Sequence, residues 1–557
     1  MGFIRVVATD FDGTVTTGGT VSDNVVASFD RLRQDGVVSV LVTGRIREEL
    51  LAEYPGLAEV FDAMVVENGA VTVVGQRARL LAAPVEQDVV AALDARGIPH
   101  RRGEVLLATD ATHAGAVLEV IGDRGSDAQL IHNRGQLMVL PAGVTKGTGL
   151  LAVLADLGLS AHNAIAIGDA ENDLAMFDVA EVGVAVANAV PSVRRHADIV
   201  LDRPNGEGLA GLFAGSFMTG SARWCPPRRW IGIGTVSDGT AAKVPGSQAQ
   251  IVVSGGSGCG KSYLVGLMVE RWIEAGYSVL VMDPEGDHSP LHQLHQVHVV
   301  DSRSALPDPR DLVNTLFAPH WSVVVDLSAL DDARKTSYMQ ALRVAAEVHR
   351  EERGFPHWLV VDEAHLLGDA EEASWMRRGG YLLSSWRPGL IPAADVDCSD
   401  IVIDCSANTP PVERGGPTSW RASMTIGSND PIEFTVSSRH TNHVRHRRKY
   451  VDRPLPSERR FYFRNSGRVD APTSAGDIAQ FRAAIGQLSP QVLEYHLERR
   501  DFSRWIEGTI GDRELAAQVG EWEDQLQAHR AADLERIRRH VVDAVDDRYL
   551  SSSPVDP

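Results

Sequence analysis

The chain has 557 residues, of which 44% are hydrophobic and 23% charged, and its formal net charge is −20. This length exceeds one ordinary core and indicates about three domains, while the acidic balance argues against a protein that coats nucleic acid through its overall field. The four cysteines form neither a disulfide framework nor a zinc-binding spacing, and no apolar run approaches the roughly 18 residues of a membrane span. Because the N-terminus also lacks a targeting signal, we expect a cytoplasmic protein with no membrane partner.

The first predicted strand ends in two carboxylates. An apolar run over residues 4–8 leads directly into D-F-D-G-T, residues 10–14. A buried parallel strand at this place puts Asp10 and Asp12 at the carboxyl edge of a sheet, where open α/β folds bind ligands. One aspartate can attack a phosphate ester while the other moves a proton, and a cation offsets the charge. Taken alone, the pattern also fits a strand that ends in an ordinary Asp-Gly turn.

Later segments of the first third repeat this placement of polar residues at element ends. A helix is predicted over residues 22–34, and strands are predicted over residues 37–42, 117–121, 137–140 and 164–167. Thr43 follows the strand over residues 37–42. Lys146 opens a later helix, and Asp169 and Asp173 follow the last strand. Hydroxyl and ammonium groups at such positions can donate hydrogen bonds to a phosphate.

In this order, the segments resemble the motifs of the haloacid dehalogenase (HAD) superfamily over about residues 1–215. The resemblance implies that Asp10 is a nucleophile that forms an aspartyl phosphate, and that Asp12 acts as general acid and then as base. It also implies that Thr43 and Lys146 bind the transferring phosphoryl group and stabilise its charge.

The same resemblance implies a Mg²⁺ ion at these strand ends. Its ligands would be Asp10, the backbone carbonyl of Asp12, and Asp169, with Asp173 in support. The cation would offset the charge of the phosphoryl group and of the carboxylates.

The position of the cap domain narrows the substrate class. Residues 14–43 hold only a helix and a strand, so the cap is expected in the longer segment that follows, at about residues 72–141. Together with the stretch E-N-G-A at residues 67–70, this position resembles the Cof-type branch of the superfamily. That branch mostly dephosphorylates sugar phosphates and similar small metabolites, so a small phosphorylated metabolite is the expected partner.

A phosphate-binding loop opens a second α/β segment. A strand over residues 251–254 leads into G-G-S-G-C-G-K-S, residues 255–262, and then into a helix, which is the context that a P-loop requires. The residues assigned to ATP and its Mg²⁺ are Gly255, Gly258, Gly260, Lys261 and Ser262. Backbone amides of the loop face the phosphates, the lysine reaches the β- and γ-phosphates, and the serine binds the metal. The cysteine of the loop, Cys259, is interpreted as a small filler residue.

Two later strand ends supply partners for the loop. The strand over residues 358–361 ends in Asp362 and Glu363, which suit binding of Mg²⁺ through a water molecule and polarisation of the attacking water. The strand over residues 381–385 runs towards Arg387. This arginine is predicted to sense the γ-phosphate or to act across a subunit boundary, and a salt bridge at a strand end is an equal alternative.

These features resemble the HerA/FtsK-like ATPases over about residues 245–410, together with the stretch D-P-E-G-D at residues 283–287. The resemblance implies a ring-forming pump of DNA or protein, so a homo-oligomer is one expected state. Trp386, however, stands where many members carry a polar residue, and the domain is short. We therefore expect nucleotide binding but not necessarily translocation.

The C-terminal region contrasts in charge with the rest of the chain. Residues 439–460 are dense in arginine, histidine and lysine, with aromatic residues nearby. They suit contact with nucleic acid phosphates, although a solvated loop or a docking face for an acidic domain is slightly favoured. Residues 475–550 have helical periodicity.

The expected fold is α/β and multidomain. Residues 1–215 are predicted to form a HAD-like parallel sheet with an α+β cap, and residues 249–430 a P-loop α/β domain. Residues 216–248 read as a linker because they are rich in Gly, Ser, Pro and Arg. Residues 431–557 are predicted to hold the basic stretch and a small, mainly helical domain.

The preferred hypothesis is a Mg²⁺-dependent phosphatase that hydrolyses a small phosphomonoester, fused to a domain that binds and hydrolyses ATP. The alternative is an ATP-driven nucleic-acid motor with an accessory phosphatase. In a third hypothesis, ATP binding gates the phosphatase by shifting its conformational populations. The sequence does not separate these hypotheses, nor does it identify the phosphatase substrate.

Overall fold

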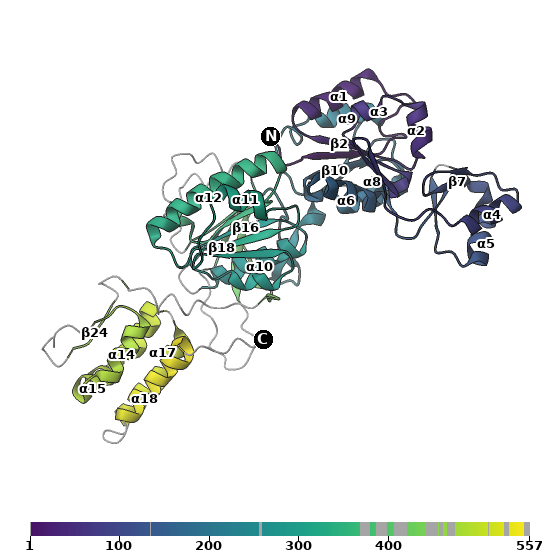
Figure 1. The fold of residues 1–557 in the computed structure, drawn as a ribbon. Coiled ribbons are helices and arrows are strands. Elements are labelled where there is room, and N and C mark those ends of the chain that lie inside the picture. Colours follow the sequence, from purple (N-terminus) through teal and green to yellow (C-terminus); the bar gives the residue numbers. More distant parts are fainter. Residues whose placement is uncertain are drawn as a thin grey trace.

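The computed structural model describes residues 2–133, 135–255, 259–367, 379–385, 398–405, 420–441, 455, 460–464, 474–510, 512–528 and 534–550. Along the chain they form an α/β part with a cap, a second α/β part, and a helical C-terminal part (Figure 1). Among these residues, no helix combines the length and the apolar character needed to cross a bilayer. The mixed α/β architecture and the helical C-terminal region confirm the predicted fold class.

The first sheet has the two predicted catalytic strands, β1 and β10, side by side near its centre. Its strand order is β12-β11-β10-β1-β2-β3-β4-β5. Strand β4 pairs antiparallel with both β3 and β5, and all other neighbours pair in parallel. The strands are β1 (Val6–Thr9), β2 (Val38–Val42), β3 (Ala63–Val66), β4 (Val71–Val74), β5 (Arg77–Leu80), β10 (Ala164–Gly168), β11 (Val182–Ala185) and β12 (Ile199–Val200). Because helices cover both faces (Figure 1), the central strands are continuous apolar runs.

The helices of this part pack on that sheet. They are α1 (Asp23–Gln34), α2 (Arg47–Glu53), α3 (Leu57–Val60), α6 (Lys146–Leu157), α7 (Leu174–Val179), α8 (Pro191–His196) and α9 (Asn205–Phe213). Gly147 and Gly149 allow α6 to lie very close to the sheet and to α7. A Cβ atom on Gly147 would lie 2.2 Å from the Ala175 carbonyl oxygen, and one on Gly149 would lie 2.5 Å from Val65. The first turn of α6 is thereby brought against the strand ends.

The cap is a separate four-stranded sheet of order β6-β7-β9-β8. Its elements are β6 (Arg101–Arg102), β7 (Leu107–Asp110), β8 (Gln129–Asn133), β9 (Gln136–Leu140), α4 (Gln87–Ala95) and α5 (Ala114–Arg124). The strand predicted over residues 137–140 forms as β9, but the strand predicted over residues 117–121 is wrong. Those residues lie in α5, where Val117, Val120 and Ile121 recur at helical spacing and pack into the core of the cap.

The second part is built on an 11-stranded sheet of order β14-β13-β23-β22-β21-β15-β20-β19-β16-β18-β17. The parallel strands are β15 (Gln250–Ser254), β16 (Val279–Asp283), β17 (Val297–Asp301), β18 (Ser322–Asp326), β19 (Trp358–Val361), β20 (Tyr381–Ser385) and β21 (Ile401–Asp404). The antiparallel strands are β13 (Ile231–Val236), β14 (Ala241–Val244), β22 (Arg421–Ile426) and β23 (Ile432–Val436). The long helices are α10 (Lys261–Glu274), α11 (Pro309–Leu316) and α12 (Asp332–Arg353).

Strands β13 and β14 lie within residues 216–248, where the composition indicates a connector with an optional short strand over residues 230–233. The alternation of isoleucine and glycine in β13 places Ile233 in the core. Gly234 is required where β13 meets β23, because a Cβ atom there would lie 2.3 Å from the Thr435 carbonyl oxygen. Glycine in a sequence often indicates a flexible segment, but in β13 it allows two strands to pair closely.

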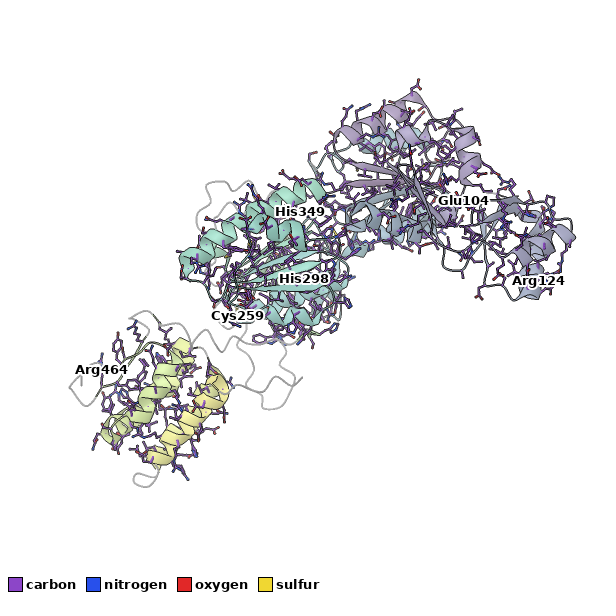
Figure 2. The ribbon with its side chains drawn as sticks, viewed as in Figure 1. Glu104, Arg124, Cys259, His298, His349 and Arg464 are labelled. Carbon is purple, nitrogen blue, oxygen red and sulfur yellow. The ribbon has the colours of Figure 1, made fainter. Side chains whose placement is uncertain are left out.

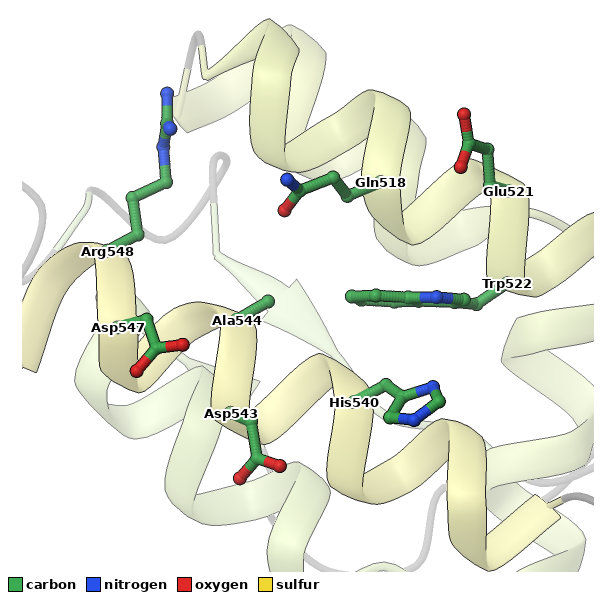
Figure 3. Close-up of a pocket in the computed structure, with 8 residues that line it drawn as sticks. All are labelled: Gln518, Glu521, Trp522, His540, Asp543, Ala544, Asp547 and Arg548. Atoms are coloured by element: carbon green, nitrogen blue, oxygen red, sulfur yellow. The ribbon is translucent and has the colours of Figure 1, made fainter.

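The C-terminal part has its own apolar core. Its elements are β24 (Phe461–Tyr462), β25 (Ser474–Ala475), α14 (Ile478–Gln487), α15 (Pro490–Glu498), α16 (Asp501–Trp505), α17 (Arg513–Ala528) and α18 (Leu534–Val545). Figure 3 shows a pocket between α17 and the segment that begins with α18, in which the rings of Trp522 and His540 lie 5.4 Å apart. Predicted helicity is therefore confirmed over this region.

A buried carboxylate joins the two α/β parts. Glu181 is fully buried and accepts hydrogen bonds from His162 Nδ1 and the Tyr277 hydroxyl, both at 2.9 Å, and from the Ser247 hydroxyl. The rings of His162 and Tyr277 are stacked with centroids 3.8 Å apart. Although burial opposes ionisation of Glu181, these partners hold its pKa below the usual range. The carboxylate is thus the centre of a polar network shared by both parts.

The starts of β10 and β19, two strands that lead to predicted site residues, also meet at this interface. Asn163, which precedes β10, donates to the Gly354 carbonyl at 3.0 Å and lies 3.2 Å from His357 Nε2. His357 directly precedes β19. Because both strands begin at the interface, their carboxyl ends, which carry predicted site residues, lie at the far edges of the two sheets.

We predict that Glu181→Ala uncouples the two α/β parts. The substitution leaves buried donors without their shared acceptor, a change that costs about 3–5 kcal/mol for comparable buried pairs. Calorimetry should resolve separate unfolding transitions for the two parts, whereas the exposed Glu207→Ala should behave as the wild type. A single, unshifted transition in Glu181→Ala would contradict the proposed role of the network.

Candidate active sites

The first candidate site is a group of buried carboxylates at the ends of β1 and β10. One carboxylate oxygen from each of Asp10, Asp169 and Asp173 lies within 4.8 Å of the others, and all three residues are buried. The Asp173 carboxylate accepts from the N–H groups of Asp169 and Ala170 at 2.8 and 2.9 Å, which fixes the loop after β10. Hard oxygen donors at this spacing suit Mg²⁺.

Lys146 brings a positive charge into this group. Its Nζ atom donates to Asp10 and Asp173 at 2.5 Å each, and the side chain is 1% exposed. Thr145 caps α6 in a capping box with Thr148, which fixes the first turn that carries the lysine. Burial raises the pKa of Asp10 to about 7, against the opposing effect of Lys146. Although burial disfavours its charge, Lys146 has its pKa raised by the two carboxylates.

Thr43 and Asp12 complete the predicted set, and Asp12 has a partner that sequence reasoning missed. Thr43 is buried at the end of β2, and its hydroxyl accepts from the N–H of Arg45 at 3.2 Å. The Arg45 guanidinium donates to both Asp12 oxygens at 2.8 Å and to Glu53 at 2.6 Å. The signal available in the sequence was the place of Arg45 two residues after Thr43.

Glu67 connects this site to the cap. Its buried carboxylate accepts from the N–H groups of Glu104, Val105 and Leu106 at 2.8, 2.8 and 3.1 Å. Glu104 lies at the junction of cap and core (Figure 2). A Cβ atom on Gly103 would lie 2.5 Å from the Glu67 carboxylate, so glycine is needed for this close approach. In the sequence, Glu67 stands out only as part of the stretch E-N-G-A at residues 67–70, because its partners are far along the chain.

The second candidate site lies at the carboxyl ends of β15, β16 and β19. Gly255 and Gly260 have φ of 145° and 94°, which glycine adopts readily, and Lys261 and Ser262 open α10. Asp362 ends β19 and lies 3.0 Å from the Nε2 atom of the fully buried His288. Gly258 and Arg387 lie outside the described residues, so their roles stay predictions.

Acidic residues gather around this loop. Asp283 organises the turn after β16 by accepting four backbone N–H groups, those of residues 285–288. Burial raises the pKa of Asp283 to about 7 and that of Asp287 to about 6, and the hydroxyl of Ser262 hydrogen-bonds to Asp287. Asp283, His288 and Asp362 offer ligand atoms within 4.8 Å of one another. The two carboxylates of this group offer the oxygen ligands that the Mg²⁺ of a bound nucleotide prefers, whereas the histidine offers a ring nitrogen.

Glu363 and His288 extend the predicted set. Glu363 has φ of 49° and lies 3.3 Å from His365 Nδ1. Such a positive φ outside glycine concentrates at functional sites. Sequence reasoning missed His288, which is brought to Asp362 only by the turn after β16. Although burial opposes it, the bond from His288 lowers the pKa of Asp362.

The basic stretch is described only at its start and at two isolated positions. Arg439, His440 and Thr441 meet α10, where the buried Glu270 accepts from the N–H groups of His440 and Thr441 at 2.7 and 2.8 Å. His440 also lies 2.6 Å from Glu274. These contacts favour a docking role for residues 439–441, and contact between residues 439–460 and nucleic acid stays a prediction.

Comparison with known proteins identifies the first part. A family model described as haloacid dehalogenase-like hydrolase matches residues 7–94 and 104–213. Phosphoglycolate phosphatase 2 of Saccharolobus solfataricus is 32% identical over 214 residues, which are 37% of this chain and 90% of that protein. The chain belongs to the haloacid dehalogenase-like hydrolases. A phosphoglycolate phosphatase of Halorubrum lacusprofundi is 36% identical over 37% of this chain and 95% of its own length.

The haloacid dehalogenase-like part is joined to a second recognised domain. A model described as the central domain of the helicase HerA matches residues 248–331.

Among solved structures, a haloacid dehalogenase-like hydrolase from Bacteroides thetaiotaomicron aligns with 38% of this chain and 98% of its own, at 20% identity and a TM-score of 0.34. Both predicted resemblances are confirmed.

We predict that Lys146→Ala destabilises the haloacid dehalogenase-like part. Asp10 and Asp173 would stay buried without their ammonium partner, and such a loss typically costs about 3–5 kcal/mol. Calorimetry in metal-free buffer should show a lower unfolding temperature for that part, and added Mg²⁺ should restore some of it. Unfolding at the wild-type temperature would contradict the expectation, and the exposed Lys243→Ala is the control.

Proposed function

We propose that residues 1–215 form a Mg²⁺-dependent phosphatase that hydrolyses a small phosphomonoester through an aspartyl phosphate. The observation that carries the proposal is the position of Lys146, whose Nζ atom lies 2.5 Å from Asp10 and Asp173 beside Asp169. This arrangement supplies a nucleophile, a fixed positive charge and a set of oxygen donors at one place. A bound Mg²⁺, held by Asp10, the Asp12 carbonyl and Asp169, would polarise the phosphoryl oxygens.

The proposed reaction gives each of these side chains a role. A carboxylate oxygen of Asp10 attacks phosphorus in line with the leaving oxygen, and Asp12 gives its proton to the departing alcohol. Asp12 then takes a proton from water, which attacks the phosphorus of the aspartyl phosphate and releases phosphate. Lys146 and Thr43 hold the transferred group throughout.

Arg45 sets a condition on the first step. Both oxygens of Asp12 accept hydrogen bonds from Arg45, so neither carries the proton that Asp12 has to donate. An anionic substrate offers Arg45 a replacement partner. Substrate binding would therefore free Asp12 from the guanidinium, and Asp12 would take up a proton from solvent before it acts as the acid.

The relatives suggest which phosphomonoester to test first. Several are named phosphoglycolate phosphatases, and they match this chain over nearly their whole length. Phosphoglycolate is small and carries a carboxylate besides its phosphate. We therefore place it ahead of the sugar phosphates that the Cof-type resemblance suggested.

The second domain is proposed to bind and hydrolyse ATP with Mg²⁺. Lys261 and the loop amides would hold the phosphates, Ser262 and Asp362 the metal, and Glu363 would polarise the attacking water. Support comes from the glycine conformations of the loop and from the Asp362–His288 pair at the neighbouring strand end. The predicted role of Arg387 belongs to the same proposal.

The match to the HerA central domain favours one alternative, an ATP-driven nucleic-acid motor with an accessory phosphatase. In that case a cytoplasmic homo-oligomer would engage nucleic acid, in part through residues 439–460. ATP turnover that rises with added DNA would support this alternative over a purely regulatory ATP site.

We predict that Asp10→Asn abolishes phosphate release from every phosphomonoester, because the amide cannot form the acyl phosphate. Phosphate release is measured with Mg²⁺ across phosphoglycolate, sugar phosphates, nucleoside monophosphates and DNA ends. The matched control is Asp88→Asn, an exposed cap residue that should retain full activity. Residual turnover by Asp10→Asn would contradict the aspartyl-phosphate mechanism.

We predict that Lys261→Ala removes ATP hydrolysis while phosphate release from small substrates persists. The ammonium is needed at the β- and γ-phosphates, whereas the phosphatase has its own lysine. ATP turnover is measured with and without DNA, and the exposed Lys243→Ala is the control. Loss of both activities in Lys261→Ala would show that the phosphatase depends on ATP.

A further inference from the structure

Two cysteine thiols converge beside the first glycine of the phosphate-binding loop. Strands β15 and β21 pair in parallel with Ser254 opposite Asp404, and the N–H of Cys405 donates to the Ser254 carbonyl at 2.9 Å. Cys405 therefore lies next to Gly255. Cys259 belongs to the loop itself and lies at the edge of the second part in Figure 2.

The side chains of Cys259 and Cys405 lie in the space beside Gly255 that a side chain at position 255 would need. A Cβ atom on Gly255 would lie 2.6 Å from Cys259 Sγ and 3.1 Å from Cys405 Cβ. Both cysteines are buried, with 7% and 2% of their surface exposed, and both are free thiols. Two thiols that share one small space are positioned to react with each other.

Their chemical environments differ in a way that suits such a reaction. Contact with the Cys405 thiol, and then the charge of Lys261, lower the pKa of Cys259 to about 7 despite burial. The pKa of Cys405 is raised by the same contact and by burial. Since the thiolate is the reactive form, Cys259 is the group that attacks an oxidant and Cys405 is the group that resolves the product.

We propose that Cys259 and Cys405 form a dithiol that hydrogen peroxide converts to a disulfide, and that this bond closes the loop to ATP. The proposal rests on the proposed binding of ATP. It replaces the interpretation of Cys259 as a filler residue. In a reducing compartment such a bond is transient and acts as a redox sensor.

The chemistry balances in two steps. The Cys259 thiolate attacks one oxygen of the peroxide, breaks the O–O bond and becomes a sulfenic acid, and the other oxygen leaves as hydroxide and takes up a proton to form water. The Cys405 sulfur then attacks the sulfenic sulfur, the S–S bond forms, and the hydroxyl leaves with the thiol proton as a second water. A thiol reductant returns the two electrons and restores both thiols.

The disulfide would act on nucleotide binding through the loop backbone. A disulfide sets its two Cβ atoms about 3.5–4.5 Å apart, which ties the loop to the end of β21. With Cys259 held to the end of β21, the adjacent Gly260 and Lys261 would be less able to adjust around the phosphates. Trp420 packs against Gly260, where a Cβ atom would lie 2.7 Å from the indole, so a shift of the loop should also alter its fluorescence.

The test uses the full chain, treated with hydrogen peroxide and then with dithiothreitol. Peptide mapping by mass spectrometry locates the disulfide, and fluorescence anisotropy of a labelled ATP analogue measures nucleotide binding. We expect a Cys259–Cys405 bond, at least about tenfold weaker binding, and full recovery on reduction. Cys405→Ser and Cys405→Ala should bind nucleotide before and after peroxide, and Cys225→Ser, whose thiol has its pKa raised by burial to about 12, should behave as the wild type.

Two results would overturn the proposal. One is that Cys259 and Cys405 stay unlinked under peroxide, and the other is that the mapped disulfide leaves nucleotide affinity unchanged. Reduced protein that binds no nucleotide would instead overturn the ATP-binding proposal itself. Because binding is measured in both redox states, the two failures are distinguishable.

Discussion

Buried carboxylates at the ends of parallel strands are the constraint on which both candidate sites depend. Burial alone would drive protons onto these groups, as the raised pKa values of Asp10 and Asp283 indicate. Each site therefore contains an internal basic side chain that contacts its carboxylates. Lys146 bridges Asp10 and Asp173, and His288 engages Asp362. A divalent ion can also balance the charge of these carboxylates, but only where several oxygen donors lie close together. The fold provides such places at the carboxyl edges of the two sheets.

The interface gives these sites a fixed relation to each other. Asn163 and His357 meet at the starts of β10 and β19, whose opposite ends carry Asp169 and Asp362. Each candidate site thus lies at the opposite end of its strand from the interface. The strands and the network at Glu181 are a physical route through which the two sites can be coupled.

The sequence identified residues whose place next to a strand or helix end indicates their role. It missed residues whose partners come close only when the chain folds. Asp10, Lys146, Lys261 and Asp362 follow strands or open helices, so periodicity and spacing located them. Arg45, His288 and Glu181 meet their partners only in the folded chain. The position of Arg45 two residues after Thr43 does not identify Asp12 as its partner. The strand predicted over residues 117–121 failed for a related reason, because a short apolar run fits a buried helix face as well as a strand.

Glu67 makes the cap part of the catalytic core in a physical sense. Its carboxylate fixes the chain at Glu104 to Leu106, and the adjacent Asn68 accepts a hydrogen bond from Asn172 at 3.0 Å. Asn172 directly precedes Asp173, which orders the loop of Asp169. One turn after β3 therefore contacts both the entry of the cap and the loop after β10 that carries Asp169 and Asp173. A substrate that moves the cap must act on this turn, so the fit of the substrate against the cap and the order of the carboxylates are not independent.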